Sequence, residues 1–529
     1  MSSPEELSLI IQAIALAIPA TLAFGAFAAP RGLLPRWALA ATGVTLGLAL
    51  LFTLGAALAR GAEPQLGVRV DAVTCVMLLL VCSIGLVIVR YSRTYLQGEP
   101  GLARYFRWLL LTLSAVTSLV IANNLLVVAL AWTGTSLALH QLLTFYSDRT
   151  TALVAAHKKF LVSRLADACL LACLALVHAN VGSLNLDGIA AWASSHPDLS
   201  PSMQVAAVLV VIAAALKSAQ LPFHGWLTQV MEAPTPVSAL LHAGVVNIGG
   251  FVLIRLSPWM VHAGFAQLLL VVIGLVSAIV AALVMTTRVS VKVALAWSTC
   301  AQMGFMLVQC GLGAWNLALL HLVAHSLYKA HAFLSAGTAV DGWRVSALTR
   351  RPPPPSLGRL GLGLTVALSS TVLAVAALEH VGALPAAGAL PVFVLAILVG
   401  LSIVPMLARR GTFGIASAAA VAARSGGVVL LYAGWHAAAA LLMPSPLGAS
   451  NPLGWVLVGT GFVGLFAVKT TLEMLPAGCL ARALHPWLFA GLYLDERFTR
   501  FTFRVWPPRL QRPQASDAIY VPLPLEARP

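Results

Sequence analysis

Long apolar runs and short polar loops alternate along almost the entire sequence. A run of about twenty apolar residues is long enough to cross a bilayer as a helix. Roughly fifteen spans are expected between residues 6 and 475. They are about 6–28, 36–59, 70–90, 105–121, 124–146, 152–179, a pair within 203–256, then 265–286, 290–311, 314–340, 358–380, 388–408, 412–441 and 453–475. The pattern therefore predicts an all-α integral membrane protein, built as a polytopic helical bundle.

The polar segments between these runs suggest four regions. Residues 1–103 hold the N-terminal transmembrane helices, and residues 104–350 hold a core with most of the polar residues at membrane depth. A proline-rich linker opens the C-terminal transmembrane helices, residues 351–478. In the last region, residues 479–529, aromatic residues mix with arginines, which favours an interfacial amphipathic helix on an anionic leaflet. An ordinary cytoplasmic tail fits the same composition.

Composition agrees with a membrane protein and excludes several other classes. The 529 residues are 60% hydrophobic and only 9% charged, whereas soluble proteins have about 25% charged residues. The net charge of +15 is spread over loops and forms no basic, aromatic-rich module, so we expect a lipid membrane and no nucleic acid as partner. The seven cysteines include no C-x-x-C pair, which favours structural thiols over a metal site.

The positive residues are concentrated in alternate loops, and this distribution predicts the topology. They follow the odd-numbered spans, whereas the even-numbered loops contain acidic residues such as Asp187 or no charge. The positive-inside rule then places the N-terminus in the periplasm and the C-terminus in the cytoplasm. The cations assigned to these loops are Arg31, Arg36, Arg90, Arg93, Arg104, Arg107, Arg149, Lys158, Lys159, Arg288, Lys292, Arg344, Arg350, Arg351, Arg409 and Arg410.

One stretch places a charge inside the apolar pattern. Lys217 ends a long apolar run, and Pro222 follows five residues later. Proline removes a backbone hydrogen bond and disfavours helix at the preceding residue, so the helix should break near Gln220 and Leu221. A lysine in hydrocarbon is retained where it faces a partner or water, although a lysine near a helix end can also snorkel. We expect Lys217 to lie at mid-membrane beside a discontinuous helix.

A second polar group lies on the eleventh expected span. His321, His325 and Lys329 are spaced i, i+4, i+8, so they lie on one face of a helix. A single buried histidine is often only a satisfied core residue. Three titratable groups on one stripe of an apolar helix favour a proton relay instead. His242, on the helix that follows Pro236, supplies a further titratable group.

These stretches resemble the proton-translocating antiporter-like subunits of respiratory complex I and of multi-subunit cation/proton antiporters. K-S-A-Q-L-P at 217–222 and P-T-P-V-S-A-L-L-H-A at 234–243 match that family nearly letter for letter. The match continues through 292–304 and 321–337, and S-R-L-A-D at 163–167 fits the family's T/S-R-x-x-D. The resemblance covers about half of the chain, from Asp71 to Asp341.

The resemblance implies a fold and a set of site residues. The fold would contain two inverted five-helix repeats, formed by spans four to eight and nine to thirteen. Asp167, Arg164 and Lys292 would be charged partners of the channel. The proton-channel residues would be Lys217, His242, His321, His325 and Lys329.

Three departures from the family pattern stand out. The family's W-E-G on the fifth span is Trp132-Thr133-Gly134 here, so the carboxylate that would partner the buried lysine is missing. His140, on the same helical face, could substitute for it, and Asp167 is the other candidate counter-ion. The twelfth span, Leu360 to Leu378, lacks the family's charge and proline, and no long lateral helix with a further span follows Glu473.

The departures fit a divergent branch, the membrane subunits of the DAB inorganic-carbon accumulation systems. That resemblance implies a bacterial cell inner membrane protein with a cytoplasmic partner, DabA, a zinc protein similar to a β-carbonic anhydrase. Flow of protons or sodium ions would then drive CO2 hydration to bicarbonate in the partner. This chain contains no zinc motif, so we expect it to carry no cofactor and to be no enzyme. A proton-pumping subunit of a respiratory or hydrogenase complex and a passive membrane scaffold are the alternatives.

Overall fold

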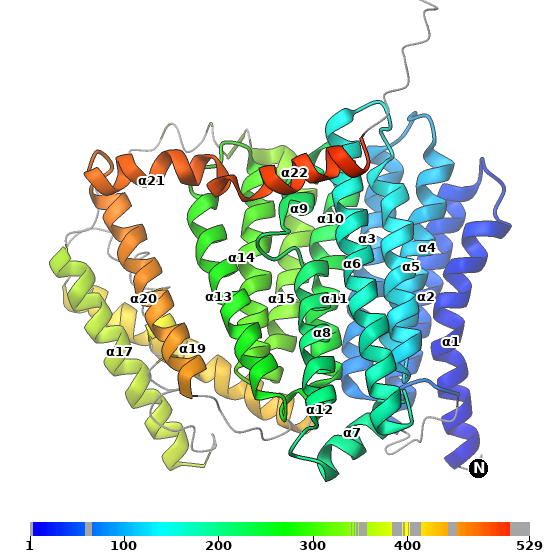
Figure 1. The fold of residues 1–529 in the computed structure, drawn as a ribbon, viewed down its shortest axis with the longest axis horizontal. Helices are drawn as coiled ribbons and strands as arrows, with labels where there is room; N and C mark the ends of the chain where they lie inside the picture. The colour runs from blue at the N-terminus through cyan, green and yellow to red at the C-terminus, as the bar shows by residue number, and fades with distance from the viewer. Residues whose placement is uncertain are drawn as a thin grey trace, which may run out of the picture.

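The computed structural model describes residues 4–58, 66–339, 357–382, 414–442 and 452–507, with a few positions between 341 and 401. Within these ranges the chain forms helices joined by turns and two isolated β-bridges, so the all-α prediction is confirmed (Figure 1). The helix bounds are α1 Pro4–Ala28, α2 Leu34–Leu58, α3 Ala72–Tyr95, α4 Leu102–Ile121, α5 Leu125–Leu143, α6 Thr150–Val181, α7 Leu186–Ser195, α8 Pro201–Lys217, α9 Gly225–Thr228, α10 Thr235–Ala243, α11 Ile248–Arg255, α12 Ser257–Met260, α13 Gly264–Met285, α14 Val291–Gly311, α15 Trp315–Leu334, α17 Leu357–His380, α19 Ile415–Leu442, α20 Pro452–Met474, α21 Cys479–Phe489 and α22 Leu494–Val505.

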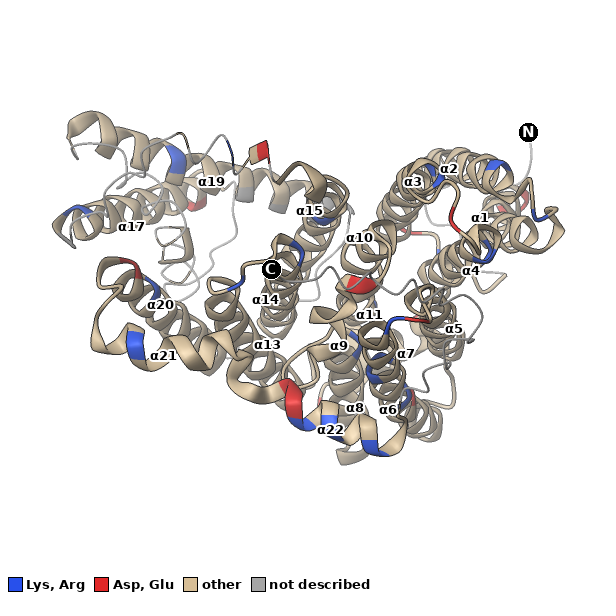
Figure 2. Ribbon diagram, turned by 90° about the horizontal axis from the view of Figure 1, so that it is seen from above, with Lys and Arg blue, Asp and Glu red and all other residues tan. Residues whose placement is uncertain are grey.

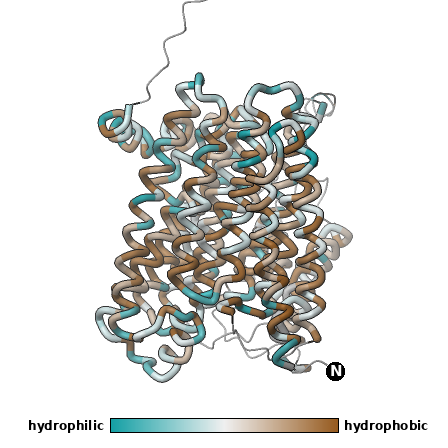
Figure 3. The backbone as a smooth tube through the Cα atoms, turned by 90° about the vertical axis from the view of Figure 1, so that its right-hand side faces the viewer, coloured by the Kyte–Doolittle hydropathy of each residue, from teal (hydrophilic) through white to brown (hydrophobic). Residues whose placement is uncertain are grey.

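Twelve helices in the described part of the chain are long and apolar enough to cross a membrane. Hydrophobic residues fill the middle of the bundle, and hydrophilic residues gather toward its two ends (Figure 3). Helix α8, with 17 residues, is shorter, and α15, which carries the histidine stripe, has 20. Of the expected spans, the one at 388–408 lies almost wholly outside the described residues, as does the proline-rich linker.

The two ends of the bundle differ. The N-terminus lies at one end, and α21 and α22 lie flat across the other (Figure 1). Seen from above, these two helices run along one side of the bundle, over the ends of α6, α13 and α20 (Figure 2). The amphipathic helix predicted after residue 479 therefore exists, although it is divided at Leu492 and Tyr493, which adopt positive φ angles of 59° and 55°.

The polar segment before α8 and the lysine pair after α5 differ from the sequence-based prediction. Helix α7 forms within the expected loop because Asn185 caps it, accepting a hydrogen bond from the backbone N–H of Asp187 at 3.0 Å. Lys158 and Lys159 were assigned to a cytoplasmic loop, which is wrong. Both lie inside α6, which begins at Thr150, and their side chains are buried.

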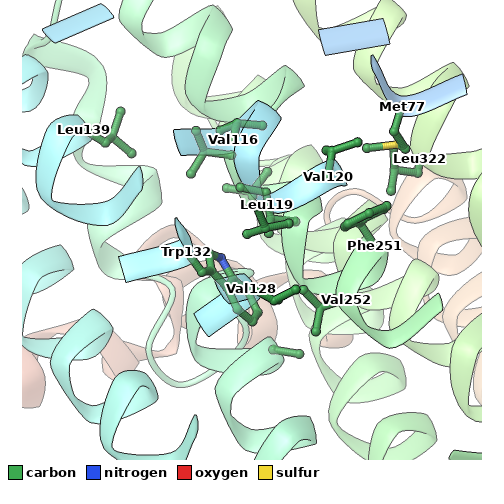
Figure 4. Packing of buried hydrophobic residues seen from close by; sticks show 14 of the residues in the cluster. Met77, Val116, Leu119, Val120, Val128, Trp132, Leu139, Phe251, Val252 and Leu322 are labelled. Atoms are coloured by element: carbon green, nitrogen blue, oxygen red, sulfur yellow. The ribbon is translucent and has the colours of Figure 1, made fainter. Parts of the chain in front are cut away.

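Close helix packing fixes the framework around the polar residues. A Cβ atom on Gly274 of α13 would lie 2.4 Å from the carbonyl oxygen of Gly304 on α14, so these backbones touch. Helix α17 is continuous, in agreement with the missing proline of the twelfth span. Around Trp132, buried apolar side chains from several helices form one cluster (Figure 4). The polar residues are thus held by rigid, tightly packed elements.

Candidate functional site

The predicted discontinuous helix is present, and its break begins directly after Lys217. Helix α8 ends at this residue, and the chain resumes a short helix only at Gly225. Side chains replace the lost helical hydrogen bonds of the break. The backbone N–H of Leu221 donates to Ser277 Oγ at 3.2 Å, and the thiol of Cys300 donates to the carbonyl oxygen of Ala219 at 3.4 Å. The break is therefore stabilised by side chains in the bundle interior.

Lys217 is buried and paired with a carboxylate. Its Nζ lies 2.7 Å from Asp167 Oδ1, and its side chain is only 5% exposed. Arg164, one turn before Asp167 on α6, lies 2.7 Å from the other carboxylate oxygen. The Lys217 ammonium also lies 4.7 Å from the ring centroid of Trp132, within reach of a cation–π interaction. A lysine, an arginine and one aspartate therefore share this site, and no snorkelling to bulk solvent occurs.

His140 is not brought to Lys217. Its ring lies near the end of α5, 6.4 Å from His157 and 5.4 Å from Phe160. Trp132, which contacts Lys217, lies two helical turns away on the same helix. Of the two candidate counter-ions, Asp167 is therefore the one that contacts Lys217.

Lys329 and His242 both contact the same turn of α14. The Nζ of Lys329 donates to Ser298 Oγ and, at 3.1 Å, to the carbonyl oxygen of Leu295. His242 Nδ1 lies 3.1 Å from Thr299 Oγ1. Because Ser298 and Thr299 are consecutive, both titratable groups are held by the same turn. Lys329 and His242 are fully buried.

The histidine stripe continues from Lys329 along α15. The rings of His321 and His325 lie 6.0 Å apart, and His321 Nδ1 contacts Gln309 Oε1 at 2.9 Å. His325 is 2% exposed, and neither of its ring nitrogens has a hydrogen-bond partner among the described residues. A buried imidazole without a hydrogen-bond partner is costly unless a water molecule reaches it. A proton relay needs an imidazole that water can reach in this way.

Lys292 lies one turn before Leu295, whose carbonyl oxygen binds Lys329, and no described ion pair includes it. It stands in the first turn of α14, and its Nζ donates to Thr235 Oγ1 at 2.8 Å. Thr235 in turn donates to the hydroxyl of Tyr95 at 3.1 Å. Lys292 thus contacts the beginning of α10 and is not paired with Asp167.

Sequence reasoning missed a contact between the C-terminal segment and the broken helix. Lys158 Nζ lies 2.7 Å from Asp495 Oδ2 of α22 and 2.8 Å from Gln229 Oε1. Gln229 Nε2 also donates to Asp495 Oδ2 at 2.6 Å. Trp506 stacks on His157 with ring centroids 4.0 Å apart. The sequence around Asp495, Y-L-D-E at 493–496, is the available signal, but no local pattern pairs it with Lys158, 337 residues away.

The described residues contain no group of three or more histidine, cysteine or acidic side chains able to hold a metal ion. A broken helix with a lysine–aspartate pair, next to a second buried lysine on a histidine stripe, instead defines an antiporter-like membrane subunit. Residues 122–351 match the family described as "NADH:quinone oxidoreductase/Mrp antiporter, TM". Residues 59–106 match "NADH-Ubiquinone oxidoreductase (complex I), chain 5 N-terminus".

The curated relatives narrow this class. The "Probable inorganic carbon transporter subunit DabB" of Hydrogenovibrio crunogenus is 41% identical over 454 residues, 84% of each chain. The "Probable inorganic carbon transporter subunit DabB2" of Halothiobacillus neapolitanus is 39% identical and covers 88% of this chain and 85% of its own. The chain therefore belongs to the DabB family of inorganic carbon transporter subunits.

More distant matches agree with the fold. "NADH-quinone oxidoreductase subunit L" of Mycobacterium tuberculosis is 33% identical over 334 residues, 62% of this chain and 51% of its own. A subunit in the structure of the Mrp complex from Dietzia sp. DQ12-45-1b superposes with a TM-score of 0.55 and 25% identity. That match covers 95% of this chain and 57% of the Dietzia chain. The protein is thus a multi-pass membrane subunit of the ion-translocating, antiporter-like class.

Proposed function

We propose that this chain conducts protons across the bacterial inner membrane as one subunit of a two-component inorganic-carbon uptake complex. The observation that carries the proposal is the pair of buried lysines, Lys217 at the end of α8 and Lys329 in α15. Ionisable side chains at membrane depth mark ion pathways because they are too costly to keep otherwise. The names of the relatives support inorganic carbon transport as the purpose of that conduction.

The proposed route links the two lysines through α14. Ala219 of the break contacts Cys300, and the preceding residue, Thr299, holds His242. Protons pass between Lys217 and Lys329 through His242 and intervening water. They then pass along His325 and His321 toward the end of the bundle at which a turn joins α14 to α15. Each step is a transfer between groups that can both accept and donate a proton.

The second component is proposed to be a DabA-like, zinc-containing cytoplasmic subunit that hydrates CO2. This chain would then supply ion flow and no catalysis. The relatives are named as subunits, which supports an assembly of more than one protein. In the proposed topology the N-terminus is periplasmic and α21 and α22 are cytoplasmic, where they could meet that partner. The ion could be sodium in place of the proton.

Growth of a carbonic-anhydrase-deficient bacterium in air tests the proposal. The chain and the candidate partner, expressed together, should restore growth, and either one alone should not. Replacing Lys217 or Lys329 with alanine should abolish the rescue, and a protonophore should do the same. Full growth with both variants would reject the relay, and growth that is insensitive to the protonophore but lost without sodium would identify the other ion.

A respiratory role is the second candidate because subunit L also matches. This chain covers 84% of the DabB relative but only 51% of the subunit L relative, which favours the first proposal. The neighbouring genes discriminate between the two. A zinc hydro-lyase-like gene beside this one supports carbon uptake, and a run of quinone-oxidoreductase genes contradicts it.

A further inference from the structure

Helices α5 and α6 face each other with two polar stripes. On α5, Trp132, Ser136 and His140 are spaced four residues apart, and on α6 Lys159, Ser163 and Asp167 have the same spacing. Such spacing places each set on one helical face. The two helices pack together and run in opposite directions. The stripes therefore form one polar seam between them.

Contacts along this seam connect its groups in order. At its inner end, Trp132 and Asp167 both contact Lys217. In its middle, Lys159 Nζ donates to Ser136 Oγ at 2.8 Å and to the Ser136 carbonyl oxygen. Lys159 and Asp167 are separated by two turns, about 12 Å along α6, and Ser163 lies between them. The seam thus spans the distance between the Lys217 site and the α21–α22 end.

The outer end of the seam lies under the C-terminal segment. His140 and His157 stand there with ring centroids 6.4 Å apart. The indole of Trp506 stacks on His157 at 4.0 Å and lies 6.2 Å from His140. Both histidines are thus placed beneath a single aromatic side chain, where the seam approaches solvent.

Lys159 is the unexplained residue of this seam. Its side chain is buried, and none of the ion pairs between described residues includes it. The charged groups that act on it most strongly include two further cations, Lys217 and Arg164. An ammonium without a counter-ion is costly in a bundle interior, and an apolar side chain would stabilise the packing better. Structural needs alone therefore do not account for a lysine here.

We propose that Lys159 is a proton-carrying residue in a half-channel between α5 and α6 that joins Lys217 to the α21–α22 end of the bundle. The inference rests on the proposed proton conduction and specifies one of its two access routes. A proton enters beside His140 and binds the Lys159 amine, and Lys159 then releases it toward Asp167 and Lys217. In each step one N–H or O–H bond breaks as another forms, so no further reactant is required.

Proton flux into vesicles tests this role. The full chain, purified together with its partner, is reconstituted into liposomes that contain the pH dye pyranine, and valinomycin with a potassium gradient sets the potential. We expect Lys159→Met and Lys159→Arg each to lower the flux at least tenfold. Arginine retains the charge and the hydrogen bonds to Ser136, but it does not release a proton near neutral pH. The matched control is Lys469→Met, at an exposed lysine of α20, which should conduct like the wild type.

Each outcome has a definite meaning. Wild-type flux in Lys159→Arg would show that a fixed cation suffices, and this result would overturn the inference. The same holds if Lys159→Met conducts like the control while Lys217→Ala does not, a result that leaves the proposed function intact. No flux in the wild type would reject proton conduction itself. Melting temperatures of detergent-solubilised variants separate lost conduction from lost folding, and a normally folded Lys159→Arg without flux supports the proton-carrying role even if Lys159→Met unfolds.

Discussion

At the scale of single residues, the central feature is one carboxylate shared by two cations. Asp167 lies 2.7 Å from Lys217 and 2.7 Å from Arg164. Within the membrane, a charge that loses its partner is left uncompensated. Removing one member of such a buried pair typically costs about 3–5 kcal/mol. The pair therefore contributes to folding and, in the proposed function, also to conduction, and separate measurements distinguish the two contributions.

Asp167→Asn should lower both the melting temperature and the proton flux. The asparagine leaves Lys217 buried without a counter-charge, so we expect a loss of stability of about 3 kcal/mol and at least a tenfold loss of flux. The double variant Lys217→Met with Asp167→Asn should recover the part of the stability that is lost through Lys217, because only Arg164 then lacks its carboxylate, but none of the flux. Thermal melts and vesicle assays measure the two quantities. A double variant as unstable as Asp167→Asn would contradict the pairing.

At the scale of elements, α22 closes over the broken helix. A Cβ atom on Gly225, the first residue of α9, would lie 1.5 Å from Asp495 Oδ1. Glycine is thus required there for the close approach of the two helices. Phe498 adds an edge-to-face contact with Phe223, ring centroids 5.5 Å apart. The C-terminal segment and the break that follows Lys217 therefore form one packed unit.

Gly225→Ala should release α22 from the bundle. The added methyl group displaces the Asp495 carboxylate from Lys158 and Gln229, so α22 unfolds locally more often and its backbone beside the exposed arginines can enter a protease. Limited digestion with trypsin should then cleave after Arg497, Arg500 or Arg504 several times faster than in the wild type. The matched control is Gly361→Ala in α17, where a Cβ atom meets nothing within 4 Å. Equal digestion of both variants would argue against the close packing.

A second set of contacts ties the loops together at the opposite end of the bundle. Asp71, which caps α3, lies 2.5 Å from Arg255 and 2.9 Å from Arg69. Arg69 reaches on to Asp187 at 3.1 Å, and Asn123 donates to the same carboxylate at 2.7 Å. Burial alone would raise the pKa of Asp71, but Arg255 and Arg69 hold that pKa well below its usual range.

This network predicts an acid-sensitive part of the stability. Because the folded-state pKa of Asp71 is depressed, its stabilisation is complete above the unfolded pKa of about 4 and declines as the pH falls toward the folded pKa. The wild type should therefore melt at a higher temperature than Asp71→Asn at pH 6, and the difference should shrink steadily below pH 4. Melting curves between pH 3 and 7 measure it. A difference that grows on acidification would contradict the sign of the shift.

At the scale of the whole molecule, the two ends of the bundle carry different groups. The proposed topology puts α21 and α22 in the cytoplasm, and α21 begins with Cys479, an exposed cysteine. Cys169 is half-buried in α6, and the other five cysteines are buried. Labelling of Cys479 therefore shows which side of the membrane the α21–α22 end of the bundle faces.

A membrane-impermeant maleimide should label Cys479 in inside-out vesicles and leave intact, right-side-out cells unlabelled. The reason is that the reagent reaches only a thiol exposed to the solution that contains it. The Cys479→Ser variant should remain unlabelled in both preparations, which assigns the signal to this residue. Labelling of intact cells would place α21 and α22 in the periplasm and reverse the proposed topology.

The sequence by itself determined the fold class, most of the spans and the break after Lys217. These follow from local causes: a membrane demands apolar runs of sufficient length, and proline interrupts helical hydrogen bonding whatever surrounds it. The i, i+4, i+8 stripe on α15 was predictable for the same reason. The four-region division and the roles of the site residues remain predictions.

Only the tertiary structure decided which groups meet. Asp167 rather than His140 pairs with Lys217. Lys159 is buried in α6 and contacts Ser136. Asp495 forms an ion pair with Lys158, which is distant in the sequence. Periodicity places a side chain on a face of its own helix, but it does not specify the helix that packs there. Close packing of helices holds this bundle together. The shapes of helices that are far apart in the sequence decide which of them pack against each other. That packing determines which buried lysines have a counter-ion.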